Sequence, residues 1–404
     1  MTEVIEKTEY KKGYKKTKLG WIPEDWDIVH LDSICDVRDG THDSPKYYNY
    51  GIPFLTSKNL TENGLDFYNV NYISEEDHKK FSERSKVENG DILFGMIGTI
   101  GNPTIVNTTI NFSIKNMALI KFFKDTKINN FYLLNTIKSK IISNQFSKTA
   151  NEGVQSFISL RKIRKLLIPL PLKEEQEKIA EILSAWDDGI ETLEKLIEQK
   201  EILKKATMQK LFLEKESWKM MRFDKIFKDF CKKNCPRERL LSATQENGVI
   251  PRDMLSGKVM SPEGSLNGYK LIEAGDFVIS LRSFQGGLEY SKYRGILSPA
   301  YTVLKNIIDI DKDFYRHFFK SYKFIEKYLS ISVIGIRDGK QISYSDLSSV
   351  KIPYPPLEEQ EKIGKILNCY DEELQLLNSK LEKLKDQKKG LMQKLLTGQI
   401  RVKV

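Results

Sequence analysis

Cysteine is scarce in this sequence. Four cysteines among 404 residues cannot form the dense disulfide framework that stabilises small secreted domains. Two of them, Cys231 and Cys235, stand close together in the stretch CKKNC, but no second ligand pair follows at a spacing typical of zinc sites. We therefore expect free thiols in a reducing compartment and assign no metal to the chain.

Long apolar runs are missing as well. No stretch approaches the ~20 consecutive apolar residues that a membrane-spanning helix needs. The opening MTEVIEKTEYKKGYKKTK is a basic segment without the apolar centre of a signal peptide. These absences predict a cytoplasmic protein that has no membrane among its partners.

The chain also lacks the motifs of nucleotide-dependent and methyl-transferring enzymes. No G-x-x-x-x-G-K-[ST] phosphate loop occurs, and GMIGTIG, which begins at Gly95, lacks the spacing and the following helix of a dinucleotide-binding turn. YPPL at Tyr354 lacks the asparagine of an adenine-methylation motif. We predict a non-catalytic chain that binds no cofactor itself.

Positive charge, in contrast, is abundant. Lysine and arginine number 65 against 55 acidic residues, which gives a formal net charge of +10. This surplus favours a polyanionic partner, and nucleic acid is the leading one. A chain of this length can hold two or three domains, each with its own core.

The most informative feature is an internal repeat. IPLPLKEEQEKIAEIL begins at Ile168 and IPYPPLEEQEKIGKIL begins at Ile352, 184 positions later, with 11 of 16 residues identical. MQKLF at Met208 and MQKLL at Met392 keep the same offset. The front of each half matches too, as WDIVHLDSI and WKMMRFDKI. The chain is therefore predicted to be a duplicated unit.

Each half combines strands with helices. DILFGMI, NMALIKFF, DFVISL and AYTVL are short apolar runs bounded by Gly, Asn or Pro, which is typical of strands. A helical stretch follows them in each half, so the predicted fold class is α+β. The segments near 40–85 and 235–265 differ between the halves, which indicates one scaffold with two different surfaces.

A long helix is expected at the end of each half. Apolar residues there recur at alternating steps of four and three, the period of a coiled coil, so the two helices are expected to pack on each other. The seam contains Ile179, Leu183, Trp186, Ile190, Leu193 and Ile197 in the first copy, and Ile363, Leu367, Tyr370, Leu374, Leu377, Leu381 and Leu384 in the second. Polar residues interrupt it at Lys200, Lys204, Thr207 and Lys388.

Taken together, the motifs resemble one family: the DNA sequence-specificity subunits of Type I restriction-modification systems. The matching pieces, found in both halves in the family's order, are LGWIPEDW from Leu19, GDIL from Gly90, both IPxP…EEQEKI segments, and LMQKLLTGQIRV from Leu391.

The resemblance implies two target-recognition domains alternating with two long helices that pair as an antiparallel coiled coil. It also implies partners: double-stranded DNA, two modification subunits that use S-adenosylmethionine to methylate adenine, and two restriction subunits that use ATP and Mg. The expected division is a basic segment (1–18), a first recognition domain (19–172), a first helix (173–214), a second recognition domain (215–356), a second helix (357–396) and a tail (397–404).

Residues that read DNA are expected in polar loops, because readout needs hydrogen-bonding groups at base edges and cations at phosphates. The competing interpretation is an ordinary polar turn. The predicted DNA-binding residues are Arg38, Thr41, His42, Lys46, Tyr47, Lys58, Asn59, Arg282, Ser283, Gln285, Arg337 and Lys340.

The repeated EEQEKI segments have two interpretations. Glutamates in the first turn of a helix complement its positive end, which explains the acids structurally. The resemblance implies instead that both segments offer equivalent faces to two modification subunits. The partner-binding residues expected on that basis are Glu175, Gln176, Lys178, Ile179, Glu359, Gln360, Lys362 and Ile363.

Two other functions are alternatives to the reading of DNA sequence. A coiled-coil interaction scaffold would have the same helices and would not read DNA sequence. A stand-alone DNA-processing enzyme is disfavoured because the catalytic motifs are missing.

Overall fold

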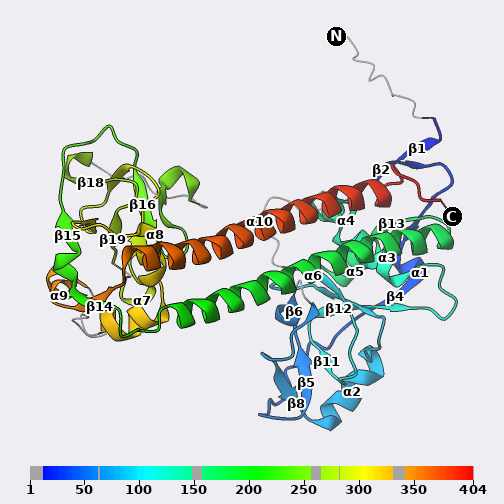
Figure 1. Ribbon diagram of the computed structural model, residues 1–404. Helices are drawn as coiled ribbons and strands as arrows, with labels where there is room; N and C mark the ends of the chain where they lie inside the picture. The colour runs from blue at the N-terminus through cyan, green and yellow to red at the C-terminus, as the bar shows by residue number, and fades with distance from the viewer. Residues whose placement is uncertain are drawn as a thin grey trace. The chain divides into compact units, whose positions relative to one another are not determined.

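The computed structural model describes residues 12–61, 64–147, 157–255, 265–281, 283–330 and 342–403. The chain divides into two compact units: residues up to Thr192 together with those from Leu381 form the first, and Leu193–Lys380 forms the second. Helices α6 (Lys173–Leu211) and α10 (Leu357–Leu396) each contribute to both units (Figure 1).

A four-stranded antiparallel sheet forms the centre of the first unit. Its strands, in spatial order, are β10 (Gly101–Ile105), β9 (Ile92–Gly95), β12 (Met117–Phe122) and β4 (Cys35–Asp39). Along β9, Ile92 and Phe94 enter one core and Leu93 enters another, because successive side chains of a strand point to opposite faces. Apolar packing therefore covers both faces of this sheet.

Shorter elements complete the first unit. The remaining strand pairings are β1 (Tyr14–Thr17) with β2 (Gly20–Pro23), β3 (Asp27–His30) with β13 (Leu167–Leu170), β6 (Leu60–Thr61) with β7 (Gly64–Leu65), and β5 (Ile52–Leu55) with both β8 (Asn71–Ile73) and β11 (Ser113–Ile114). The helices are α1 (Leu31–Ile34), α2 (Glu75–Ser85), α3 (Asn130–Lys138), α4 (Lys140–Ser147) and α5 (Leu160–Arg164).

The second unit contains an equivalent sheet. Its strands, in spatial order, are β15 (Phe227–Phe230), β22 (Thr302–Asn306), β19 (Phe277–Ile279) and β20 (Glu289–Tyr290). Aromatic rings fill its core more than in the first unit. Phe319, for example, lies 5.4 Å from Phe227 and 4.8 Å from Phe324 between ring centroids.

The remaining elements of the second unit are paired short strands and short helices. Strand β14 (Lys219–Arg222) pairs with β23 (Lys351–Tyr354), β16 (Leu241–Thr244) with β17 (Gly248–Pro251), and β18 (Lys270–Ile272) with β21 (Gly295–Leu297). The helices are α7 (Ser283–Gly286), α8 (Lys312–Phe318), a π-helical turn at Phe324–Leu329, and α9 (Tyr344–Ser348).

The sequence repeat is visible as a structural repeat. In each unit, the strand containing the IPxP motif pairs antiparallel with a strand near the front of the same half, β3 in the first and β14 in the second. A buried tyrosine on the helix that follows the sheet, α3 in the first unit and α8 in the second, contacts that strand. Tyr132 donates to the carbonyl of Pro169 at 2.9 Å, and Tyr315 donates to that of Pro353 at 3.0 Å. The two α+β halves thus share one scaffold.

Cross-helix ion pairs account for three polar interruptions of the apolar seam. In the first unit Lys388 of α10 pairs with Asp187 of α6. In the second, Lys204 of α6 lies 2.5 Å from Asp371 of α10. Both members of the second pair are 184 positions from their counterparts in the first. Lys200 similarly pairs with Glu373 at 2.7 Å.

Asp371 provides a test of these pairs. It accepts from both Lys204 and Arg316, the latter at 2.9 Å. Burial opposes ionisation of its carboxyl group, but Lys204, His317 and Arg316 together outweigh this effect and hold the pKa below its usual value. After discounting for partial exposure, Asp371→Asn should cost roughly 1–2 kcal/mol, a fall of about 2–5 °C in the unfolding midpoint.

The matched control is Asp187→Asn, at the equivalent but more exposed position, which should cost less than about 0.5 kcal/mol. Because the pKa of Asp371 is lowered by folding, its contribution is present above pH ~4 and is lost as the pH falls through the folded pKa. Thermal unfolding at pH 7 and below pH 4 measures both effects. Equal losses for the two variants would contradict the assignment.

Candidate nucleic-acid interface and helix junctions

Several predicted DNA-binding residues of the first unit have partners inside the chain. Arg38 of β4 donates to Asp36 at 2.7 Å and to the carbonyl of Arg84 at 3.0 Å. Thr41 is buried, and its hydroxyl accepts from the backbone of Asp43. These contacts shape the loop that follows β4.

His42 and Asn59 are similarly engaged. The His42 ring lies within hydrogen-bond distance of Asn116 (2.7 Å) and Asp39 (3.0 Å). Asn59 is buried; its amide oxygen accepts from the backbone of Thr56, and its amide nitrogen donates to the carbonyls of Asp66 and Asn69. We therefore assign Asn59 a structural role instead of the predicted contact with DNA, because its hydrogen-bonding groups are used internally.

Lys46, Tyr47 and Lys58 are exposed, as is the side chain of His42. The ammonium group of Lys46 lies 5.5 Å from the centre of the Tyr48 ring. Tyr47 and Tyr48 are exposed, as are two tyrosines that the sequence analysis did not single out, Tyr50 (83% exposed) and Tyr68 (98%). For Tyr50 the missed signal is the run of three tyrosines that follows Lys46 in PKYYNYG, because basic and aromatic side chains together suit nucleic-acid surfaces.

The second unit gives fewer positions to assess. Arg282, Arg337 and Lys340 lie outside the described residues. Ser283 is buried and its hydroxyl accepts from the Ser280 amide at 2.8 Å, whereas Gln285 is exposed on the same short helix, α7.

A lysine that the sequence analysis missed anchors the loop around α7. Lys320 donates to the carbonyls of Gly286 and Gln245 and to the carboxylate of Glu289 at 2.7 Å. Glu289 is fully buried, and burial raises the pKa of its carboxyl group despite the neighbouring ammonium. This contact joins the α7 loop to the turn between β16 and β17.

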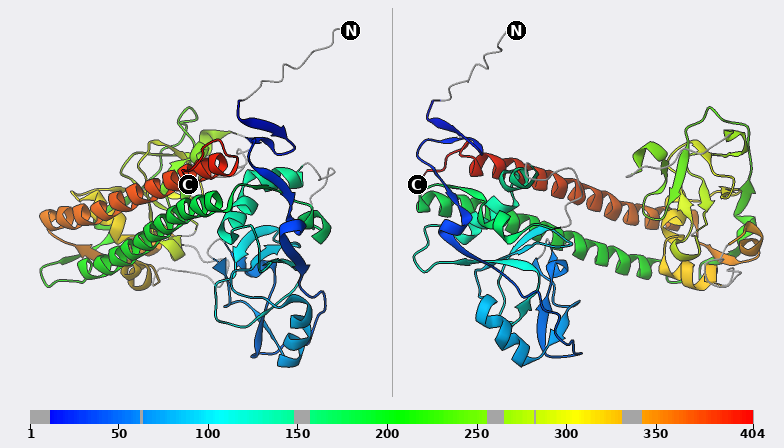
Figure 2. Two further views of the ribbon diagram at one scale, coloured as in Figure 1. Left: turned by 90° about the vertical axis from the view of Figure 1, so that its right-hand side faces the viewer. Right: turned by 180° about the vertical axis from the view of Figure 1, so that it is seen from behind.

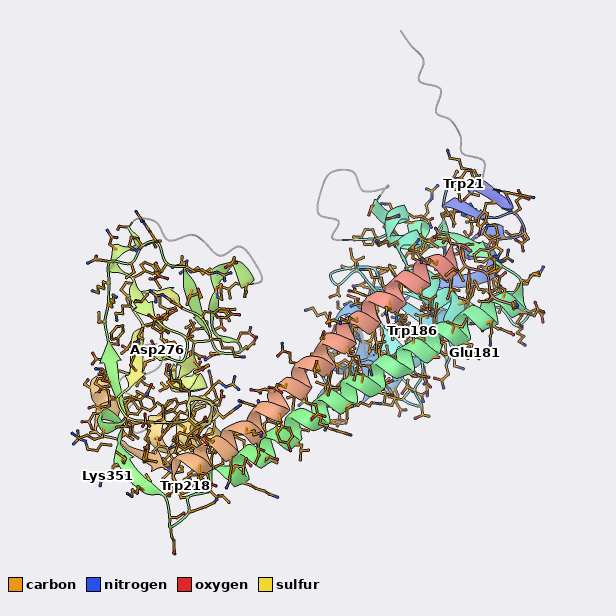
Figure 3. The ribbon with its side chains drawn as sticks, turned by 45° about the horizontal axis from the view of Figure 1, so that its top comes forward. Trp21, Glu181, Trp186, Trp218, Asp276 and Lys351 are labelled. Atoms are coloured by element: carbon orange, nitrogen blue, oxygen red, sulfur yellow. The ribbon has the colours of Figure 1, made fainter. Side chains whose placement is uncertain are left out.

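The two EEQEKI segments form equivalent junctions inside the chain. At the start of α6, Glu175 accepts from the Trp26 indole at 3.0 Å; at the start of α10, Glu359 accepts from the Trp218 indole at 2.8 Å. Trp218 immediately precedes β14, and Trp186, a residue of the seam, lies on α6 (Figure 3). Trp26 and Trp218 thereby join the front of their halves to a long helix.

The following glutamines complete these junctions. Gln176 accepts from the Asn129 backbone at 2.9 Å and donates to the carbonyls of Lys127 and Pro171. Gln360 accepts from the Asp311 backbone at 3.0 Å and donates to the carbonyl of Pro355. Each glutamine therefore hydrogen-bonds both to the N-cap residue of a helix, α3 or α8, and to the end of the IPxP strand.

This burial changes the expected role of the segment. The side chains of Glu175, Gln176, Ile179, Gln360 and Ile363 are buried, and that of Glu359 is mostly covered. They bind within the chain, so the surface needed for the expected partner contact is not available on them. Lys178 and Lys362 are exposed and pair with glutamates on their own helices.

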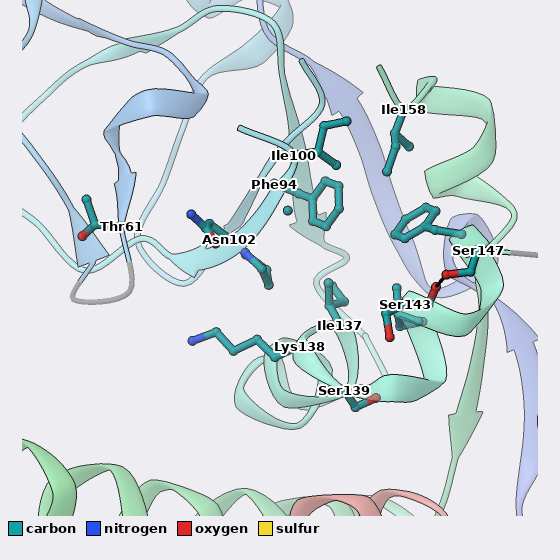
Figure 4. Close-up of a pocket in the computed structure, with 14 residues that line it drawn as sticks. Thr61, Phe94, Ile100, Asn102, Ile137, Lys138, Ser139, Ser143, Ser147 and Ile158 are labelled. Atoms are coloured by element: carbon teal, nitrogen blue, oxygen red, sulfur yellow. Dashed lines mark hydrogen bonds between the residues drawn. The ribbon is translucent and has the colours of Figure 1, made fainter. Parts of the chain in front are cut away.

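A cavity of about 750 Å³ lies beside the β9–β10 turn of the first unit (Figure 4). Phe94, Ile100 and Ile158 supply apolar walls, and Asn102 and Lys138 supply polar groups.

Within the described residues, no group of three or more His, Cys, Asp or Glu side chains could hold a metal. Among those same residues no helix has both the length and the apolar character to span a membrane.

Comparison with known proteins identifies the architecture. The model of a family described as Type I restriction modification DNA specificity domain matches residues 23–202 and again 215–386. A Methanocaldococcus jannaschii protein named as the MjaX specificity subunit of a type I restriction enzyme is 30% identical, over 97% of this chain and 98% of that protein. The MjaVIII specificity subunit of the same organism is 28% identical, over 95% and 94%.

Solved structures agree on the fold. A chain from a structure of type I restriction-modification complex assembly has a TM-score of 0.61 at 17% identity, over 94% of this chain and 99% of that one. The S subunit of a Type I system from M. genitalium has a TM-score of 0.54 at 18% identity, over 92% and 96%. The fold of this chain is thus similar to that of both structures. The chain belongs to the Type I restriction-modification specificity family, as its motifs predicted.

The buried glutamine provides a second test. Gln176→Leu keeps the approximate volume but leaves the Asn129 amide and two carbonyls without their partner, so it should destabilise the first unit by roughly 2–4 kcal/mol. Gln176→Glu should also destabilise, because an ionised carboxylate cannot donate to the two carbonyls. Unfolding in urea measures the loss. Lys178→Ala, two residues away and exposed, is the control and should stay within about 0.5 kcal/mol of the parent.

Proposed function

We propose that this chain reads a bipartite, asymmetric DNA target, with one recognition domain on each half-site. The observation that carries the proposal is the combination of a duplicated scaffold with unlike loops. The junctions, the sheets and the IPxP strands repeat, whereas the polar segments near 40–85 and 235–265 do not. Identical frames with different reading surfaces favour two different half-sites.

The exposed lysines and tyrosines of the first unit are suited to the proposed contact. Lys46 and Lys58 would hold phosphates, and Tyr47, Tyr48 and Tyr50 offer hydroxyl groups and aromatic faces. Arg38, Thr41 and His42 would then act mainly by holding the loop in shape. In the second unit Gln285, Arg282, Arg337 and Lys340 stay proposed contacts with DNA.

The long helices would separate the two reading surfaces. We propose that α6 and α10 pair along their length as an antiparallel coiled coil, consistent with the ion pairs found in each unit. Helix α6 contains 39 residues and is therefore about 58 Å long. That length would leave an unread gap between the half-sites.

Chemistry would come from partners. We propose that two modification subunits, using S-adenosylmethionine, methylate adenine at the site selected by this chain, and that two restriction subunits use ATP and Mg. This chain would be non-catalytic and would hold none of these cofactors. Lys178 and Lys362, exposed at equivalent positions of α6 and α10, are the proposed points of contact with the two modification subunits.

A change in helix length tests both the readout and the spacer. One heptad is inserted into α6 between Asp187 and Lys200 and one into α10 between Glu373 and Lys388, which preserves the ion pairs. The unread gap should lengthen by about 10 Å, or about three base pairs. Modified-base sequencing of DNA from cells that express each chain with its modification partner measures the gap. An interaction scaffold predicts no split motif at all, and an unchanged gap would contradict the spacer.

Contact with phosphates is tested at Lys46. Lys46→Gln should weaken binding to DNA and reduce the slope of log affinity against log salt by about one, because one fewer counterion is released. Fluorescence anisotropy with the modification partner present gives the slope. Lys380→Gln, an exposed lysine of α10, is the control and should leave the slope unchanged.

A further inference from the structure

The segment that follows α10 packs against the front of the first unit. Tyr14 of β1 donates to the carbonyl of Gly398 at 2.8 Å. Gly398 has a φ of +67°, and a Cβ atom there would collide with the ring of Pro23 in β2. Both views in Figure 2 show the end of α10 beside these strands. The fit requires glycine at this position.

Arg401 makes the main polar contact of this segment. Its guanidinium donates to both oxygens of Glu175, at 2.7 and 2.9 Å, and to both oxygens of Asp25, at 2.9 and 2.7 Å. It also lies 5.8 Å from the centre of the Trp26 ring. The side chain of Glu175 is only 4% exposed, so this carboxylate depends on its partners for compensating charge.

The second unit has a similar arrangement with a lysine in place of the arginine. Lys215 donates to Glu359, the counterpart of Glu175, and lies 5.8 Å from the centre of the Trp218 ring. Lys215 is three residues before Trp218 in the chain, so the peptide itself holds the cation and the tryptophan together. Arg401 and Asp25 are 376 positions apart.

We infer that Arg401 is a positioning residue. Its contacts hold the front of the first recognition domain against the long helices, and in the second recognition domain the continuous peptide before Trp218 has that role. A peptide joins the end of α6 to Trp218, whereas side-chain contacts join the end of α10 to Trp26. The planar guanidinium can bind two carboxylates bidentately, and a lysine ammonium cannot. The inference rests on the proposed function, because the position of the first domain on the long helices would determine how it contacts its half-site.

Hydrogen–deuterium exchange on the full-length chain tests the joint directly. Arg401→Ala should speed amide hydrogen exchange in residues 20–30 by at least about tenfold, because it leaves the buried Glu175 carboxylate without its positively charged partner. Exchange in β9 and β12 should stay unchanged and so show that the domain is folded. Lys215→Ala, the matched control, should change exchange at 216–226 by less than about threefold. Arg401→Lys, a milder change, should give an intermediate effect in the same segment.

Equal effects of Arg401→Ala and Lys215→Ala, or no effect of Arg401→Ala, would overturn the inference. If Arg401→Ala speeds amide exchange throughout the chain, Arg401→Lys becomes the deciding variant. It must then speed exchange in residues 20–30 and leave the rest of the chain unchanged. If it does not, the positioning role is rejected.

DNA binding with the purified modification partner provides the second readout. Arg401→Ala should reduce discrimination against substitutions in one half-site by about tenfold and leave discrimination at the other half-site unchanged. Lys215→Ala should change neither. Loss of discrimination at both half-sites would reject the selective role of Arg401. A wild-type complex without sequence preference would reject the proposed function instead, while the exchange experiment would still decide the joint.

Discussion

The Glu-Gln pair at the start of each long helix, with a buried glutamine in both copies, is the constraint on which the rest of the chain depends. Burying an amide or carboxylate raises the free energy of the folded state unless its hydrogen bonds are made. These residues therefore hold their hydrogen-bond partners in defined positions. The glutamate accepts from the tryptophan at the front of its half, and the glutamine contacts the end of the IPxP strand and the N-terminus of a helix, α3 in the first unit. One turn of helix thereby fixes how each domain packs against its long helix.

The same junction serves two differently packed domains. The first unit surrounds its sheet largely with aliphatic side chains, and the second uses a network of phenylalanine and tyrosine rings. The sheet order and the tyrosine contacts to Pro169 and Pro353 are kept nevertheless. Core composition can drift as long as volume and pattern are maintained, whereas a buried polar network tolerates much less change.

The sequence predicted the scaffold well because repetition and periodicity act locally. The start of each long helix, the IPxP strands and the mixed α+β character follow from the motifs and their spacing. The roles of individual polar residues did not follow. Gln176 and Asn59 looked like surface residues because no pattern in a sequence shows that a distant backbone amide needs a partner. Lys320 and Arg401 were missed for the same reason: their partners are defined by tertiary contacts.

The ion pairs between α6 and α10 have one more consequence, which concerns orientation. Each repeat carries an aspartate and, 17 residues later, a lysine: Asp187 and Lys204 in one, Asp371 and Lys388 in the other. If the two helices ran in the same direction with the repeats aligned, aspartate would face aspartate and lysine would face lysine. Like charges repel, so that arrangement is disfavoured, and each acid meets a base when the directions are opposed. Duplication of a single charged pattern thus disfavours the parallel alternative.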